Sequence, residues 1–242
     1  MSMLSQSAAN DPGLRRFVGA DLPSPKCYFM LPHFKGGVSL ENSGMSPEPL
    51  SYGGFTFAER DSRAAFYVHS LVAPVFDAEN IAIEPATSGR QVTPTAFLFG
   101  SRSNMLTQEL LQGSGQSLFH FEFGNSWKIC CNGMEFAMPD PSQVKDPAQY
   151  ENTTDFGVVA RFRTLGESPV FVIAGLGGRA TEGSARFFVK NWSQLATTFG
   201  EDDFAEVLQF DPPFQLERSR VVTTARLERS RVVTTARYRT SS

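Results

Sequence analysis

Two segments of the chain place glycine and small polar residues directly after an apolar run. The first, Gly100-Ser-Arg-Ser-Asn104, follows residues 95–99, and the second, Gly175 to Gly183, follows residues 170–174. Glycine permits positive φ angles and close approach of a ligand to the backbone. The unpaired amides and the dipole at the start of a helix attract anions. We therefore expect a binding site for a small anionic molecule where these two strands end.

Each segment also carries an arginine, Arg102 or Arg179. Guanidinium groups bind phosphate and carboxylate in bidentate geometry, so two of them facing one crevice would suit such a ligand. Three other interpretations remain open: helix capping by Ser101 or Ser103, pairing of the arginines with Glu109 or Glu182, and tight packing of helix on strand. The predicted binding residues are Gly100, Ser101, Arg102, Ser103, Asn104, Gly175, Gly177, Gly178, Arg179 and Thr181.

The second segment has the pattern G-x-G-x-x-A from Gly175 to Ala180, directly after an apolar run and before a helical pattern. This pattern is part of the dinucleotide-binding fingerprint, which also needs an acid about 20 residues further on, at the tip of the next strand. The candidate there, Asp211, lies 31 residues beyond Ala180. The sequence therefore favours another anionic ligand over NAD or FAD, and we expect no cofactor.

A small esterase or lactonase is the second function that the sequence allows. The amides of residues 175–178 could form an oxyanion hole, although the nucleophile elbow G-x-S-x-G does not occur in the chain. No catalytic residue can be assigned, and a purely structural interaction module is a third possibility. The available nucleophiles are Ser101, Ser103, Cys130 and Cys131, and the available bases are His33, His69 and His120.

Cysteine and histidine usage argues against a metal centre and against a disulfide framework. The three histidines show neither H-x-H nor H-E-x-x-H spacing, and Cys27 is far from the adjacent Cys130 and Cys131. An odd number of cysteines fits a reducing compartment. The N-terminus does not read as a signal peptide, and no run of about 18 apolar residues occurs. We expect a cytoplasmic protein that does not bind membranes, and a homo-oligomer stays open.

The charge is unevenly divided, because an 11-residue segment beginning at Leu216 is repeated without change as residues 227–237. Residues 216–242 carry a balance of +5, and residues 1–215 a balance of −8. An acidic body repels phosphate backbones, so nucleic acid is not an expected partner. So short a repeat is not typical of a solenoid. We interpret the tail as a cloning scar, vector read-through or recent duplication, the alternative being a basic arm that folds on a partner.

Hydrophobic periodicity predicts alternating strands and helices. Strands are expected at residues 26–31, 80–84, 95–99, 118–123, 127–131, 156–162, 170–174 and 205–210, and helices at 61–72, up to Gly113, and from the Gly175–Gly183 segment to Gly200. This order predicts an α/β fold, a three-layer Rossmann-like sandwich with a mixed, mainly parallel sheet and an antiparallel edge hairpin. The expected organisation is an irregular N-terminal segment with one strand (1–56), the Rossmann-like α/β domain (57–215) and the duplicated basic tail (216–242).

The order of strand, glycine, small polar residues and helix in residues 95–112 and 170–190 resembles the ligand edge of two kinds of protein. These are Rossmann-like nucleotide sensors and nucleoside deoxyribosyltransferases. The resemblance implies a nucleotide-like ligand at the two glycine-marked strand ends. A deoxyribosyltransferase also needs a nucleophilic carboxylate in a recognisable helix motif, which we do not find in this sequence, so no catalytic residue is carried over.

Overall fold

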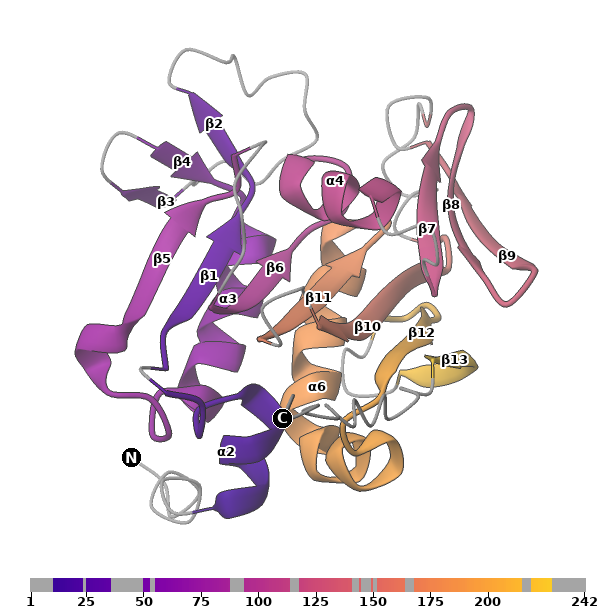
Figure 1. The fold of residues 1–242 in the computed structure, drawn as a ribbon. Helices are drawn as coiled ribbons and strands as arrows, with labels where there is room; N and C mark the ends of the chain where they lie inside the picture. Colours follow the sequence, from indigo (N-terminus) through magenta and orange to yellow (C-terminus); the bar gives the residue numbers. More distant parts are fainter. Residues whose placement is uncertain are drawn as a thin grey trace, which may run out of the picture.

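A seven-stranded mixed sheet forms the centre of the computed structural model (Figure 1). The structure describes residues 11–23, 25–35, 50–52, 55–87, 94–113, 118–140, 144, 149, 152–163, 168–214 and 219–227. The strand order is β13-β12-β10-β11-β6-β1-β5. The strands are β1 (Cys27–Leu31), β5 (Ile81–Pro85), β6 (Thr95–Phe99), β10 (Asp155–Arg163), β11 (Pro169–Gly175), β12 (Asp203–Phe210) and β13 (Arg220–Leu227).

The sheet has a parallel half and an antiparallel half. Strands β5, β1, β6 and β11 run parallel to one another, and the ladders from β11 through β10 and β12 to β13 are antiparallel. The strands expected at residues 156–162 and 170–174 pair with one another in the antiparallel β10–β11 ladder. The predicted α/β class is therefore correct, and the strands expected at residues 95–99 and 170–174 lie side by side.

Two layers cover the sheet, one on each face (Figure 1). Helices α2 (Pro12–Val18), α3 (Glu59–Val72) and α6 (Gly178–Phe199) pack on one face. The other face carries α4 (Met105–Gly113) and a three-stranded antiparallel sheet made of β7 (Phe119–Phe123), β8 (Ser126–Cys131) and β9 (Met134–Pro139). The remaining elements are β2 (His33–Lys35), β3 (Leu50–Tyr52), β4 (Phe55–Phe57) and the 3₁₀ turn η2 (Ala78–Asn80).

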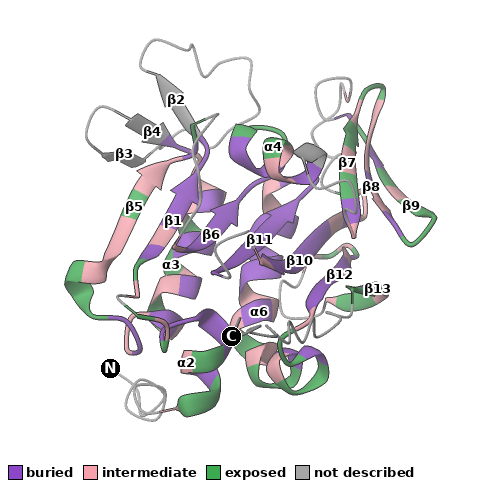
Figure 2. Ribbon diagram, in the orientation of Figure 1, coloured by how far each residue is buried: buried purple, intermediate pink, exposed green. Residues whose placement is uncertain are grey.

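Alternation along the central strands divides the core into two apolar clusters, and the strands themselves are almost wholly buried (Figure 2). On β6, Phe97 and Phe99 join the cluster under α2, α3 and α6, whereas Ala96 and Leu98 join the cluster under α4 and β7–β9. The rings of Phe97 and Phe171 stack with centroids 4.7 Å apart. Each such side chain stabilises the fold by about 1.5–3 kcal/mol through burial, so the abundant phenylalanines are mainly core residues.

Helix α6 lies unusually close to the sheet because small residues line the contact. A Cβ added to Gly157 on β10 would lie 2.2 Å from the Ser184 hydroxyl oxygen, and one added to Gly183 would lie 2.3 Å from the ring of Phe210. Glycine within a helix costs about 1 kcal/mol relative to alanine. The close packing of helix on sheet offsets that cost, and it requires glycine at both positions.

Segments before and after residues 57–215 also contribute to the central sheet. Residues 1–56, expected to be irregular apart from a strand at 26–31, supply the interior strand β1 and helix α2, and the phenyl ring of Phe17 on α2 packs against Phe171. The first copy of the repeated segment supplies β13, which pairs with β12 and buries Ala225. Residues 220–227 are therefore part of the sheet in this structure, while the rest of the second copy lies outside the described residues. Within the described part of the chain, no helix is both long enough and apolar enough to cross a bilayer.

Truncating the chain at two positions tests whether the first copy of the repeat, and not the second, contributes to the stability of the sheet. Removing residues 228–242 keeps β13 and should leave the melting temperature unchanged. Removing residues 216–242 exposes the edge of β12 and should lower the melting temperature by roughly 3–8 °C, if about 1–2 kcal/mol of burial and pairing is lost. Thermal unfolding followed by circular dichroism measures both. Equal melting temperatures for the two truncated chains would contradict the assignment of β13.

Candidate functional site

The two glycine-marked strand ends touch one another at the carboxyl edge of the sheet. Phe99 at the end of β6 is in register with Ile173 on β11. The Ser101 hydroxyl donates to the carbonyl oxygen of Gly175 at 2.7 Å, and the Gly100 amide donates to the carbonyl of Ile173 at 3.3 Å. Since α4 leaves β6 on one face and α6 leaves β11 on the other, this is a topological switch point, the usual location of a ligand in an open α/β sheet.

The start of α6, however, already holds an anion that belongs to the chain. The carboxylate of Asp155, the first residue of β10, is 2 % exposed. One of its oxygens accepts from the Gly177 amide at 3.0 Å and from the Phe156 amide at 2.8 Å, and the other accepts from the Ala180 amide at 3.1 Å. The Gly177 amide, which is expected to receive a ligand, and the Ala180 amide are therefore occupied by Asp155.

Burial and hydrogen bonding act on Asp155 in opposite directions. Burial disfavours the charged form and raises the pKa to about 6, whereas the backbone donors and the charge of Arg179 hold it down. The carboxylate is therefore mostly ionised at neutral pH. A negative charge at this position also matches the positive end of the α6 dipole.

Three of the predicted binding side chains point inward and serve the fold. The Asn104 side chain donates to the carbonyls of Phe99 and Met30 at 2.8 and 3.3 Å and accepts from the Thr107 amide at 3.0 Å. It is Asn104, and not Ser101 or Ser103, whose side chain accepts an amide of the first turn of α4. The Thr181 hydroxyl accepts from the Gly175 amide at 3.0 Å. Asn104 and Thr181 therefore join strand ends to helices, and Ser101 joins the two strand ends to one another.

The two arginines do not face one crevice in this structure. The Arg102 guanidinium lies 4.9 Å from the ring centroid of Trp127, which belongs to the cluster under α4 and β7–β9. The Arg179 guanidinium lies 4.4 Å from the ring centroid of Phe214, which packs on the opposite cluster. Each guanidinium is drawn to the nearest aromatic face, on a different side of the sheet. Of the predicted residues, Arg102 and Ser103 are exposed, and Gly178 and Arg179 are half-buried.

The first turn of α3, which the sequence analysis did not connect with the site, lies across both strand ends. A Cβ on Gly100 would be 3.2 Å from the carboxylate of Asp61, and a Cβ on Gly178 would be 3.1 Å from the side chain of Arg60. Gly100 has φ +81°, so the loop is already in a conformation that favours glycine. Sequence spacing could not show this contact, because Asp61 lies 39 residues before Gly100 and Arg60 lies 118 residues before Gly178.

Arg60 and Asp61 have different environments. Arg60 donates to Glu182 of α6 at 2.7 Å, and this glutamate, 1 % exposed, also contacts Arg186 at 3.3 Å. Glu182 is therefore a partner of these two arginines, which tie α3 to α6. Asp61 is 6 % exposed, and burial raises its pKa to about 7. A buried carboxyl that titrates near neutral pH at a switch point is a common mark of a functional site.

The groups considered for hydrolysis are dispersed over the molecule. The Ser101 hydroxyl is bound to Gly175, and the Gly177 amide of the proposed oxyanion hole is bound to Asp155. Cys131 is buried in the core and Cys130 lies on the opposite face of β8, as their adjacent positions in a strand predict. Burial and the neighbouring Glu122 raise the pKa of the Cys130 thiol, which disfavours a thiolate nucleophile. This geometry gives the hydrolase no specific support.

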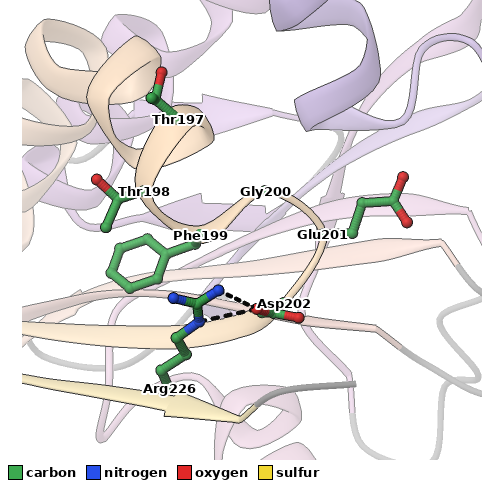
Figure 3. Close-up of a pocket in the computed structure, with 7 residues that line it drawn as sticks. All are labelled: Thr197, Thr198, Phe199, Gly200, Glu201, Asp202 and Arg226. Atoms are coloured by element: carbon green, nitrogen blue, oxygen red, sulfur yellow. Dashed lines mark hydrogen bonds and ion pairs between the residues drawn. The ribbon is translucent and has the colours of Figure 1, made fainter. Parts of the chain in front are cut away.

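A hollow of about 340 Å³ lies at the other end of α6, about 33 Å along the helix from Gly178 (Figure 3). Its wall includes Asp202, whose carboxylate accepts from Arg226 Nε at 2.9 Å and Nη2 at 2.5 Å. This ion pair joins the α6–β12 turn to β13. The other charged residue of the wall, Glu201, lies 3.8 Å from Arg16 and 3.9 Å from Arg163. The lining residues are Thr197, Thr198, Phe199, Gly200, Glu201, Asp202 and Arg226.

Comparison of the chain with protein-family models, curated proteins and solved structures found no match. The resemblance of the two strand ends to nucleotide sensors and deoxyribosyltransferases therefore stays a prediction. The candidate site depends on the geometry of the carboxyl edge alone.

Replacing Asp155 with alanine removes the acceptor of three backbone amides. We expect Asp155→Ala to lower the free energy of unfolding by about 3 kcal/mol, because buried donors are left without partners. Asp155→Asn retains one acceptor oxygen and loses the bond to Ala180, so about 1–2 kcal/mol should be lost. Urea denaturation measures both variants.

Asp211 provides the matched control for this experiment. It is exposed and accepts from Thr154 and Gln209 at 2.9 and 2.7 Å. Asp211→Ala should cost less than about 1 kcal/mol, as for other exposed polar contacts. If Asp155→Ala were no more destabilising than Asp211→Ala, the carboxylate would not be what holds the start of α6.

Asp61 should make the stability of the chain fall as pH rises toward neutrality. Its pKa is about 7 in the folded chain against an ordinary value of 3.8, so the folded state binds the proton more tightly. The stabilisation is complete below the ordinary value and is lost as pH rises through about 7; it amounts to at most about 4 kcal/mol. Asp61→Asn, which cannot ionise, should flatten the dependence between pH 5 and 7.5 in urea titrations. Parallel pH profiles for the two chains would refute this account of Asp61.

Proposed function

We propose that the chain is a binding module for a small anionic, nucleotide-like ligand at the carboxyl edge of the sheet, between the Gly100 loop and the first turns of α3 and α6. The observation that carries the proposal is that three helices, α3, α4 and α6, begin at this edge. Each helix contributes the positive end of its dipole, which favours a negative charge nearby.

The amides at the three helix starts differ in whether a side chain of the protein already accepts their hydrogen bonds. Asp155 occupies the amides at the start of α6, and Asn104 occupies an amide at the start of α4. The N-cap residue of α3, Ala58, has no side-chain acceptor. We infer that the ligand lies at the exposed rim of the Gly100 loop, between the start of α3 and Arg102 and Ser103. The Arg102 guanidinium would leave the ring of Trp127 to bind the anionic group.

Asp61 couples this binding to pH. The protonated carboxyl can donate to an anionic oxygen, whereas the ionised carboxylate repels it. Because the pKa of Asp61 is raised to about 7, both forms are populated at neutral pH. Anion binding should therefore strengthen as pH falls through this value.

Binding is tested with nucleotides, sugar phosphates and inorganic phosphate, using the shift in melting temperature and then calorimetry. A ligand at 100 times its Kd stabilises the native state by about 2.7 kcal/mol, which is a shift of roughly 5–10 °C for a chain of this size. Arg102→Ala should weaken binding about tenfold, as expected for the loss of one charge-assisted contact. Asp61→Asn should bind with little pH dependence between pH 6 and 8.

Arg16 supplies the control for the lost charge. It is exposed on α2 and lies 3.8 Å from Glu201, which follows the end of α6 opposite to Gly178. Arg16→Ala should leave the affinity unchanged. The proposal fails if no anionic compound in the panel shifts the melting temperature, or if Arg102→Ala and Arg16→Ala bind equally well.

A further inference from the structure

A second cluster of chemically active side chains lies on the outer face of the β7–β9 sheet. Strand pairing sets Cys130 on β8 opposite His120 on β7, and Glu122 follows His120 two residues later on the same face. One donor atom of each side chain lies within 4.8 Å of the other two. The inner face of the same strands carries Phe119, Ile129 and Cys131, which pack into the core. Packing of the inner face therefore holds in place the backbone that carries His120, Glu122 and Cys130.

The separation of two of these donors already suits a tetrahedral metal ion. His120 Nε2 and Glu122 Oε1 are 3.3 Å apart. Two ligands bound at about 2.0 Å around a tetrahedral ion stand about 3.3 Å from one another. The Cys130 sulfur, on the residue directly opposite His120, lies within 4.8 Å of a donor atom of His120 and of one of Glu122. Nitrogen, oxygen and sulfur donors together are the ligand types of zinc.

Neighbouring charges favour a cation on balance. Glu135 on β9 is paired with Cys130 across the ladder, and its carboxylate is held by the Lys128 ammonium at 2.7 Å. Glu122 and Glu135 are therefore two acids beside one thiol, with a single lysine opposing them. About half of the His120 and Glu122 side-chain surface is exposed, which leaves an ion a direct route from solvent.

We propose that His120, Glu122 and Cys130 form a binding site for a divalent transition-metal ion of the zinc type, with a water molecule as the fourth ligand. The site is separate from the carboxyl edge and does not depend on the function proposed there. Metal binding would release the thiol proton to solvent and form a metal–thiolate bond, with no change of oxidation state. Sequence spacing does not identify this site, because Cys130 comes close to His120 and Glu122 only through the pairing of β8 with β7.

The experiment is a titration of the full chain with Co²⁺ and Zn²⁺ under reducing conditions. Cobalt bound by a thiolate shows a charge-transfer band in the near-ultraviolet and tetrahedral d–d bands in the visible range. We expect these bands to saturate at one equivalent of Co²⁺ and to disappear when Zn²⁺ is added. Cys130→Ser should abolish the charge-transfer band, and His120→Ala and Glu122→Gln should weaken Zn²⁺ binding at least about tenfold.

Two further variants fix the location of the ion. Glu79→Gln changes an exposed carboxylate on η2 and should bind Zn²⁺ as the parent chain does. Lys128→Ala removes the opposing charge and should tighten Zn²⁺ binding, because Lys128 lies beside Glu135 and faces Glu122 in the ladder. Circular dichroism confirms that each variant is folded. The absence of a thiolate band, or a band that survives Cys130→Ser, would overturn the proposal.

Discussion

Helix α6 is held at both ends by a single strand, β10, and much of the molecule is arranged around that constraint. At the start of β10, the buried Asp155 carboxylate accepts from the Gly177 and Ala180 amides. Six residues later on the same strand, the Arg161 guanidinium donates to the carbonyls of Gly200 and Asp202 at 2.7 and 2.6 Å. The acid meets the positive end of the helix dipole and the base meets the negative end, so both charges are stabilising.

Arg161 is a charged side chain that is buried in the core to make this contact with the end of α6. The side chain is 1 % exposed, and its guanidinium contacts the rings of both Phe17 and Phe204, with centroids at 4.8 and 5.4 Å. Burial lowers its pKa to about 10, which still leaves it charged at neutral pH. The aromatic faces and the two carbonyls together offset the cost of removing the charge from water. Helix α2 is thereby drawn into the core, since Phe17 belongs to it.

The same constraint determines what the carboxyl edge can bind. A glycine-rich turn before a helix is a frequent anion site, but here the chain provides its own anion, so Gly175 and Gly177 serve close packing and internal hydrogen bonding. A ligand must instead use the exposed rim and the start of α3. Arg102, Ser103 and the titratable Asp61 are then the side chains that would contact the ligand. Three other predicted binding residues, Ser101, Asn104 and Thr181, turn inward because they make hydrogen bonds within the fold.

The sequence predicted the class of fold well because its strongest signals are periodic. The alternation in residues 118–123 and the long amphipathic pattern of α6 survive in the structure almost unchanged. Contacts between distant segments could not be predicted in this way: Asp155 lies in a polar stretch 22 residues before Gly177, and Asp61 reaches Gly100 only through the packing of α3. Strand β13 was missed because its sequence belongs to a repeat, and pairing with β12, not the pattern itself, makes it a strand. The His120–Cys130 pairing likewise depends on the register of two strands.

The occupied start of α6 is tested most directly by a pH titration of the amide resonances of Gly177 and Ala180. If Asp155 accepts both amides, their proton shifts should lie downfield at neutral pH and move together with a midpoint near the Asp155 pKa of about 6, and both amides should exchange slowly with solvent. Amides that exchange freely, or that respond to added phosphate but not to the ionisation of Asp155, would show that the turn is open to an external anion.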